Sequence, residues 1–491
     1  MGAFNSTEYL KDQIEKQYNS EVKTKHKNTL DFSSFQGELS ALTEKKYNFI
    51  HELVKNQSIE VIQECLKESK FTYSDLIIYF IKRIKDNDYK YNSILYFNPK
   101  ALIEAKSKVY NKNNHLLYGM PILVKGNIGV KGMPLTAGAA ALKENISKRD
   151  SRIVENLKAK GAIILGQTNL SEFANYMTSN SSNGYSAIGG QTKNPFGTFD
   201  VGGSSAGSAV ALDKNFAIAT IGTETAGSII YPSSQNGVIG LKPTLGSISQ
   251  DMIIPISKTH DIPGPMTRNI VDQYILLDAI KNNKGSKPLF NEKFLRNKKI
   301  GVINNQKILK TYRKSDHLFL EALRKDLSSK GAVVETVELE ENLFQYDISD
   351  ILSYEFKDGI NSFLKDNFNG SEINTLDKII ENNKMELDSC ATYGQDLLEN
   401  ASNNDFNEKD ISKTIREYTF GASKVFDKIF KKYDFLLTIS NYMTTPYACS
   451  GNPAINFPIG QRDSGEPIGG TFIGRKNREV DLIDAVYAYL T

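Results

Sequence analysis

The spacing of apolar positions changes along the chain near residue 118. Before that point, apolar side chains recur three and four residues apart among charged ones, over 39–54 and over 61–66, which predicts amphipathic helices. A further helix should begin at Thr72 or Ser74, each a suitable N-cap, and carry one apolar face: Leu76, Ile77, Phe80, Ile81 and Ile84. We therefore expect residues 1–70 to form an N-terminal helical extension packed on the core.

From residue 118 onward, short apolar runs alternate with helical patterns, which favours an α/β sheet over a helix bundle. The run 121–125 predicts a strand, and a helix over 150–160 ends at Gly161 before a strand over 162–165. A new helix is expected from Thr168. Later helices are predicted over 267–280, 315–329 and 481–490, and later strands over 299–303, 332–337, 435–439, 455–458 and 471–474.

The polar segment 340–430 reads as mostly helical and is expected to be an insertion over one end of the sheet. Neither an internal repeat nor a low-complexity linker divides the chain. We therefore predict one large domain over 71–491, which follows the extension over 1–70.

Composition narrows the possible partners. The 60 Lys and Arg nearly balance the 57 Asp and Glu, and the net charge of +3 gives no reason to expect nucleic acid. No run approaches the ~18 to 20 apolar residues that span a bilayer. Because the first forty residues lack the apolar core of a secretory signal, we expect a cytoplasmic protein, or a secreted or periplasmic one if a leader has been removed.

Metal chemistry is not expected from the cysteines and histidines. Three scattered cysteines, Cys65, Cys390 and Cys449, fit neither a disulfide framework nor a zinc site, and we interpret each as a small buried apolar residue. The five histidines show no ligand spacing: His26, His51, His115, His260 and His317. We predict that the protein uses no metal and no cofactor.

Candidate nucleophiles lie in glycine-rich stretches over 201–210, 221–230 and 237–246. The run 203–207 formally matches G-x-S-x-G, with Ser205 as nucleophile and His260 as its base in a Ser-His-Asp hydrolase. That motif should follow a buried strand, and 196–201 is a poor match for one. The ordinary alternative for such Gly-Ser runs is a pair of tight turns.

Lys125 offers a different base, because it ends the apolar run 121–125. A free lysine titrates near 10.4, so fewer than about one in a thousand is neutral at pH 7, but burial lowers the pKa by several units. The alternative is a lysine that extends from a strand end into solvent.

Four blocks carry a family resemblance: Tyr-Gly-Met-Pro-Ile-Leu-Val-Lys over 118–125, Gly-Gly-Ser-Ser-Ala-Gly-Ser over 202–208, Gly-Thr-Glu-Thr-Ala-Gly-Ser-Ile over 222–229 and Gly-Val-Ile-Gly-Leu-Lys-Pro-Thr over 237–244. In order, spacing and identity they resemble the amidase signature family. Further blocks resemble those of bacterial peptide amidases, over 189–196, 264–266, 354–359 and 393–398. The resemblance extends over roughly 70–490 and leaves the first forty residues outside it.

The resemblance implies an α/β fold in which helices cover both faces of a mixed central β-sheet. It implies a Ser-cisSer-Lys triad with Ser228 as nucleophile, Ser204 as the bridging serine on a cis peptide bond, and Lys125 as base. The two serines are 24 residues apart, as in the family. The implied oxyanion hole is built from backbone N–H groups of the run that ends at the nucleophile: Thr225, Ala226, Gly227 and Ser228.

The chain departs from the family pattern at three places. Gly126 stands before Asn127 where most relatives have Asp, so a carboxylate beside the lysine is missing. Its loss could ease deprotonation of Lys125 or leave the side chain less well held. Ile230 replaces a frequent Arg, and Ala226 a frequent Gly or Asp.

Substrate is inferred from the resemblance to peptide amidases, which implies hydrolysis of C-terminal carboxamides on peptides with release of ammonia. Candidate substrate contacts are Ser179 and Asn180 in the polar loop 179–185, together with Tyr231; an ordinary surface loop is the alternative. Other possibilities are an aryl, aliphatic or fatty-acid amide hydrolase, the glutaminase subunit of a tRNA amidotransferase, and a non-catalytic binding protein. We expect a monomer or homodimer acting on a peptide or small-molecule amide.

Overall fold

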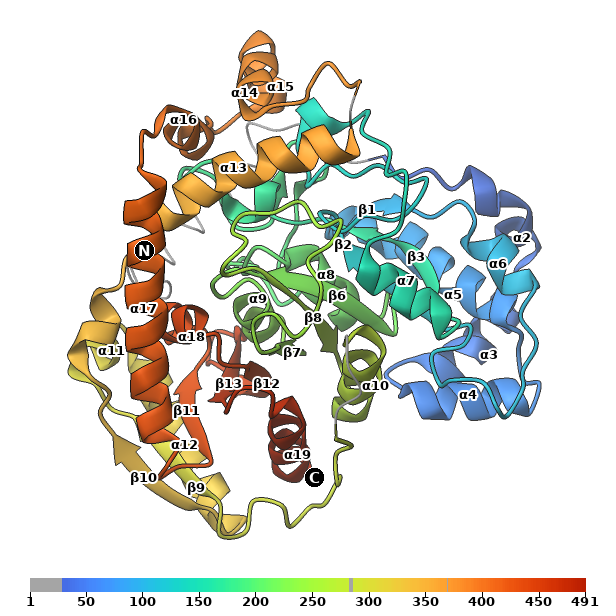
Figure 1. The fold of residues 1–491 in the computed structure, drawn as a ribbon. Helices are drawn as coiled ribbons and strands as arrows, with labels where there is room; N and C mark the ends of the chain where they lie inside the picture. Colours follow the sequence, from blue (N-terminus) through green and yellow to red (C-terminus); the bar gives the residue numbers. More distant parts are fainter. Residues whose placement is uncertain (1–28, 282–285, 369) are drawn as a thin grey trace.

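A computed structural model describes residues 29–281, 286–368 and 370–491. Its centre is an eleven-stranded mixed sheet with the strand order β1-β3-β2-β6-β8-β7-β12-β13-β11-β9-β10. The strands of this one sheet come from residues 94 to 473, so the prediction of one large α/β domain is confirmed (Figure 1). The expectations for residues 1–28 lie outside the described residues.

Seven of the eleven strands of the central sheet lie where apolar runs predicted them, whereas β1, β6, β7 and β8 were not predicted. Those of the central sheet are β1 Ile94–Phe97, β2 Pro121–Lys125, β3 Ile163–Thr168, β6 Ala219–Glu224, β7 Ile239–Lys242, β8 Ile262–Thr267, β9 Lys299–Ile303, β10 Val333–Val337, β11 Phe435–Ile439, β12 Ala454–Gln461 and β13 Pro467–Ile473. A separate small pair consists of β4 Tyr185–Ser186 and β5 Gly190–Gln191.

Helices follow the amphipathic segments. They are α2 Gln36–Ala41, α3 Glu44–Val54, α4 Ile59–Lys67, α5 Tyr73–Asn87, α6 Ala101–Lys106, α7 Arg152–Ala159, α8 Ala206–Asp213, α9 Ile230–Gln235, α10 Ile270–Ile280, α11 Gln306–Leu309, α12 Lys314–Ser329, α13 Ser349–Asn367, α14 Leu376–Met385, α15 Leu387–Cys390, α16 Asp396–Asn403, α17 Glu408–Ile429, α18 Thr444–Ser450 and α19 Glu479–Leu490. Short 3₁₀ turns are η1 Ser33–Phe35, η2 Asp88–Lys90, η3 Ala140–Leu142, η4 Glu172–Asn175 and η5 Glu341–Gln345.

Helices cover both faces of the sheet, as expected. Strand β2 lies between β3 and β6 and is parallel to both. The chain passes from β2 through α7 to β3, and then through α8 to β6 on the other side of β2. Since such crossovers are right-handed, α7 and α8 lie on opposite faces. Helix α10 packs against α7 and α19, whereas α9 packs against α8.

The N-terminal helices α2 to α4 pack beside α5 (Figure 1). The pattern over 39–54 is not one helix, because the chain breaks after Ala41 and restarts at Thr43, whose hydroxyl caps α3. Thr72 is the N-cap of α5 and forms a capping box with Asp75. The backbone N–H of Ile59 donates to the Asp272 carboxylate of α10 at 3.0 Å, which joins the first helices to the core.

The segment between β10 and β11 is helical, as predicted, and supplies α13 to α17. In Figure 1, α13 to α16 lie along the top of the molecule and α17 runs down its left side. Helix α13 packs against α14, α16 and α17. These helices therefore form a layer beyond the carboxyl ends of β2 and β6, where they help to enclose a cavity described below.

The prediction of a helix from Thr168 is wrong. Strand β3 continues through Thr168, and after it Phe173, Ala174 and Asn175 take left-handed backbone angles, with φ of 47°, 56° and 77°. A right-handed helix excludes such angles. The backbone of this segment forms hydrogen bonds with distant residues instead of helical ones, since the N–H of Ser171 donates to Ser204 O at 3.1 Å.

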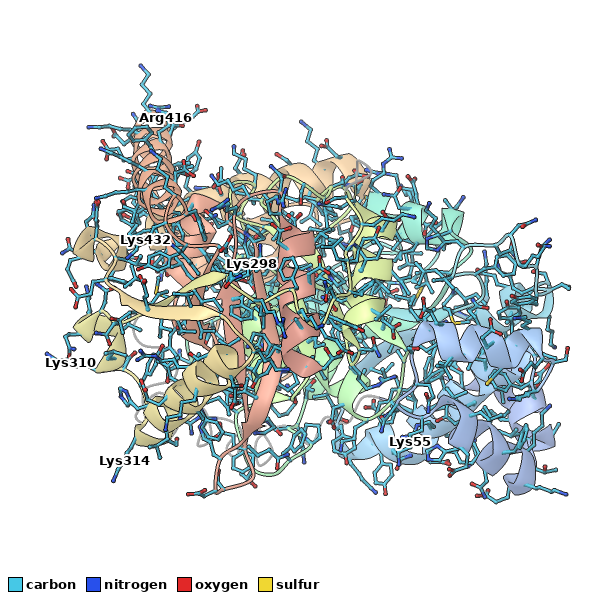
Figure 2. The ribbon with its side chains drawn as sticks, turned by 90° about the horizontal axis from the view of Figure 1, so that it is seen from below. Lys55, Lys298, Lys310, Lys314, Arg416 and Lys432 are labelled. Carbon is cyan, nitrogen blue, oxygen red and sulfur yellow. The ribbon has the colours of Figure 1, made fainter. Side chains whose placement is uncertain are left out.

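Charged side chains are distributed over the outside of the molecule. Figure 2 labels cations from well-separated elements, among them Lys55 after α3, Lys314 in α12 and Arg416 in α17. Within the described residues, none of the helices is both long and apolar enough to cross a membrane. The three cysteines are buried and free, as expected.

One buried ion pair should contribute strongly to stability. Arg462 contacts the Asp316 carboxylate at 2.7 Å, and both side chains are almost fully buried. Replacing Arg462→Met leaves Asp316 charged without its cation, so we expect a loss of about 3 to 5 kcal/mol in the free energy of unfolding, measured by urea denaturation. As a control, Arg478→Met removes an exposed partner of Asp481 and should cost under about 1 kcal/mol. Equal losses would contradict this account.

Candidate active site

The residues singled out in the sequence meet at one edge of the sheet. Lys125 is the last residue of β2, and Glu224 is the last residue of β6, four residues before Ser228. Ser204 lies two residues before α8. Because β2, β3 and β6 are parallel, their carboxyl ends share this edge, which is where α/β sheets commonly carry their sites.

Lys125 is fully buried and faces hydroxyl groups. Its Nζ lies 2.7 Å from Ser204 Oγ, 2.9 Å from Thr223 Oγ1 and 3.2 Å from Thr223 O. Burial lowers the pKa of the Lys125 ammonium to about 7, although the nearby carboxylates of Asp261 and Glu224 act to raise it. A substantial fraction of the side chain is therefore a neutral amine at neutral pH.

The two adjacent serines differ in their contacts. The Gly203–Ser204 peptide bond is cis, and the Ser204 side chain faces Lys125. The Ser205 hydroxyl instead donates to Thr223 O at 3.1 Å, which ties α8 to the end of β6. Hence Ser205, the serine that the G-x-S-x-G match selects, does not contact the lysine.

The histidine proposed as the alternative base has other partners. His260 is buried, and its Nδ1 is hydrogen-bonded to the hydroxyls of Thr259 and Ser257, at 2.9 and 3.1 Å. Burial, with Lys242 nearby, lowers the pKa of His260 to about 4. The Ser205 hydroxyl is hydrogen-bonded to the β6 backbone, so the Ser-His-Asp hypothesis receives no support from these contacts.

A buried carboxylate organises the turn that carries Ser228. Glu224 Oε2 accepts from the N–H groups of Ile229 and Ile230, at 2.8 and 3.0 Å. Its Oε1 accepts from the hydroxyl of Tyr447 at 2.9 Å. Gly227, with φ of 90°, turns the chain immediately before Ser228. The run 225–228 is thus fixed at both ends, which is the rigidity that preorganised N–H donors require.

Ser228 faces a large cavity. The cavity encloses about 840 Å³. Its inner wall consists of the run 225–228 together with Gly203 and Tyr231. The opposite wall comes from α13 and α16 and the loop after α16, including Leu352, Leu397 and Phe406. A cavity of this size accommodates a substrate much larger than a simple amide.

Of the three predicted substrate contacts, two line this cavity and one does not. Tyr231 lines it, and its hydroxyl donates to the buried Asp200 carboxylate at 2.7 Å. Ser179 also lines it, and its hydroxyl donates to Asp396 of α16 at 2.7 Å. Asn180 is exposed and is not among the lining residues.

A second cavity, of about 330 Å³, lies beside the first. The two share the lining residues Ala174, Thr225 and Ile256. The second cavity reaches Thr223, which contacts Lys125, and Asp261. Thr225 therefore stands between the substrate-sized cavity and the surroundings of the lysine.

In the described part of the chain, no group of three or more His, Cys, Asp or Glu side chains could hold a metal ion. The chemistry that the site offers is that of a buried amine, hydroxyls and turn N–H groups.

The family model for Amidase matches residues 75–441. The chain belongs to the amidase family. It is thus an amide-hydrolysing enzyme, as the sequence blocks led us to expect. An amidase family protein from Bacillus anthracis has a structure with a TM-score of 0.88 and 30% identity, over 93% of this chain and 95% of that one.

Two further similarities extend over most of the chain. A peptide amidase from Stenotrophomonas maltophilia has a TM-score of 0.81 and 31% identity, over 89% of this chain and 96% of that one. A probable amidase from Arabidopsis thaliana is 28% identical over 470 residues, 89% of this chain and 90% of its own length.

Several residues of this amidase site were not predicted as site residues. Thr223 and Glu224 lie within the block 222–229, for which the family resemblance implies roles only over 225–228. Asp261 and Asp200 come from other segments and become neighbours of the site only through folding, Asp261 because β8 pairs antiparallel with β6. The glutamate and threonine could have been noticed as polar residues at the end of a buried strand.

Gly126 of the amidase lies against a packed side chain and the backbone. A Cβ there would lie 2.8 Å from Leu95 Cδ2 and 3.1 Å from the backbone oxygen of Thr168. An aspartate at 126 would therefore require the buried Leu95 side chain to move.

Gly126→Asp should consequently destabilise the amidase by about 1 to 3 kcal/mol, through crowding of a filled core. Urea denaturation measures this loss. The matched control is Gly37→Asp in α2, where a Cβ meets nothing within 4 Å, and which should change stability by less than about 0.5 kcal/mol. A fully stable Gly126→Asp variant would show that Leu95 moves aside readily.

Proposed function

We propose that the enzyme hydrolyses C-terminal carboxamides of peptides or peptide-like amides through Ser228, Ser204 and Lys125. The observation that carries the proposal is the fully buried Lys125 amine 2.7 Å from Ser204 Oγ, beside the cavity that Ser228 lines. A neutral amine in that position can accept a proton, which makes a serine hydroxyl a nucleophile without histidine.

In the proposed reaction, Ser228 Oγ attacks the amide carbonyl carbon while its proton passes to Ser204 and the Ser204 proton passes to Lys125. The N–H groups of the run 225–228 stabilise the oxyanion. The C–N bond then breaks, the nitrogen takes back a proton, and ammonia leaves. Water attacks the acyl-enzyme by the same relay, which releases the carboxylic acid and restores Ser228.

The substrate class is supported by two features. The cavity of about 840 Å³ has room for several residues of a peptide, and a peptide amidase of known structure is 31% identical over most of both chains. A second candidate, an aryl or aliphatic amide hydrolase, is favoured by the apolar side chains on the outer wall, Leu352, Leu397 and Phe406.

Ser228→Ala should lower ammonia release from peptide amides by at least about a thousandfold, because the attacking oxygen is removed. The measurement is kcat/KM on a panel of an amidated dipeptide, an aryl amide, a fatty-acid amide and glutamine. Circular dichroism of the variant checks that the fold is intact. Unchanged rates in Ser228→Ala would eliminate the proposed nucleophile, and preference for the aryl amide would favour the second candidate.

The pH dependence should follow the lysine. Only neutral Lys125 accepts the proton, and its pKa is lowered to about 7, so kcat/KM should rise through about pH 7 and level off on the alkaline side. Initial rates between pH 5 and 9.5 test this. A maximum near pH 5 would be incompatible with a lysine base.

A further inference from the structure

Asp261 reaches the site from a distant part of the chain. It directly precedes β8, whose first residue, Ile262, pairs with Glu224 at the end of β6. Antiparallel pairing brings the start of β8 to the edge at which β2 and β6 end. The Asp261 side chain is thereby buried beside the turn that leads to Ser228, with 8% of the residue exposed.

Both carboxylate oxygens of Asp261 accept hydrogen bonds. The hydroxyl of Thr225 donates to Oδ1 at 2.5 Å. The N–H groups of Ile256 and Ser257 donate to Oδ2, at 2.8 and 3.0 Å. Thr225 begins the run 225–228, so Asp261 connects the proposed oxyanion hole to the fixed loop before β8.

Asp261 lines the second cavity together with Thr223, whose hydroxyl contacts the Lys125 amine at 2.9 Å, so its carboxylate lies at the same edge as the lysine. The position next to the lysine is Gly126, which contributes no carboxylate, and a Cβ there would crowd Leu95. The carboxylates whose charge favours the Lys125 ammonium are Asp261 and, more weakly, Glu224. Glu224 is already engaged by two N–H groups of the Ser228 turn and by Tyr447.

We propose that Asp261 is a positioning residue for the reaction proposed above: it holds the oxyanion turn through Thr225 and places a negative charge at the edge of the sheet where Lys125 ends. The inference rests on the proposed function, because it assigns a role toward that function's base and oxyanion hole. One side chain then couples the two groups that must act together when the tetrahedral intermediate forms.

The ionisable groups around Lys125 and Asp261 decide in which direction the loss of the Asp261 charge moves the pKa of Lys125. Lys125 faces Asp261 and Glu224, and Asp261 is also influenced by Glu355 of α13. Burial raises the pKa of the Asp261 carboxyl to about 6, against the hydrogen bond from Thr225. The carboxyl is therefore largely ionised in the range where the lysine loses its proton. A negative charge favours the ammonium, so removing that charge lowers the pKa of Lys125.

Two substitutions separate the two roles. Asp261→Asn removes the charge, and the rising limb of kcat/KM against pH should move about one unit toward lower pH. Thr225→Val keeps the carboxylate but removes the hydrogen bond, so kcat on the alkaline plateau, where Asp261 is ionised, should fall about tenfold. A merely structural role for Asp261 would lower the rate without moving the limb.

The matched control is Asp251→Asn. Asp251 lines the same second cavity but pairs with Arg149 at its rim, with 37% of its side chain exposed. Its substitution should leave the limb where it is in the unaltered enzyme. An unmoved limb in Asp261→Asn, or an equal shift in Asp251→Asn, would overturn the charge role.

If Asp261→Asn does not fold, Thr225→Ser and Thr225→Val decide the matter, because serine keeps the hydroxyl that Asp261 holds. Serine should retain most of kcat, and equal kcat in the two variants would overturn the proposal. Ser228→Ala distinguishes the two levels of inference. If it remains active, the proposed function fails; if it is inactive and the Asp261→Asn limb is unmoved, only the role of Asp261 fails.

Discussion

The site depends on the removal of one lysine from water. An ammonium group in the interior is costly, and a lysine there becomes neutral at a pH where free lysines are charged. Lys125 meets this condition because it ends a strand buried on all sides, with its amine against the oxygens of Ser204 and Thr223. The surrounding carboxylates limit how far its pKa falls, so desolvation and charge act in opposite directions.

The parallel arrangement of β3, β2 and β6 explains how distant residues meet. Each right-handed crossover returns the chain to the same edge, first with Lys125 and later with the two glycine-rich turns. The antiparallel β8 adds Asp261 to that edge from its own beginning. Four segments therefore contribute to the site, and Ser204 comes from the end of the long, mostly irregular segment 169–205 between β3 and α8.

Short sequence patterns predicted the elements that depend on interactions between residues close together in the chain. The apolar runs predicted strands such as β2, whereas the local G-x-S-x-G pattern selected Ser205, and Ser204 and Ser228 were expected only from the family resemblance. The segment after Thr168 was mistaken for a helix because its backbone groups find tertiary partners, which no window of sequence reveals. Asp261 was missed for a related reason, since its contacts with Thr225 and the Ile256 N–H follow from strand pairing. The crowding of position 126 by Leu95 is likewise visible only in three dimensions.

The cavity before Ser228 has walls of different origin. The reacting side comes from the turns after β2 and β6, whereas the outer side comes from α13, α16 and the loop after it, between β10 and β11. Mutations in that outer segment leave the residues of the proposed proton relay unchanged, because those residues lie on the reacting side. The architecture thus allows substrate preference to diverge among descendants of one ancestor, and gives protein engineers a region to randomise without rebuilding the catalytic machinery.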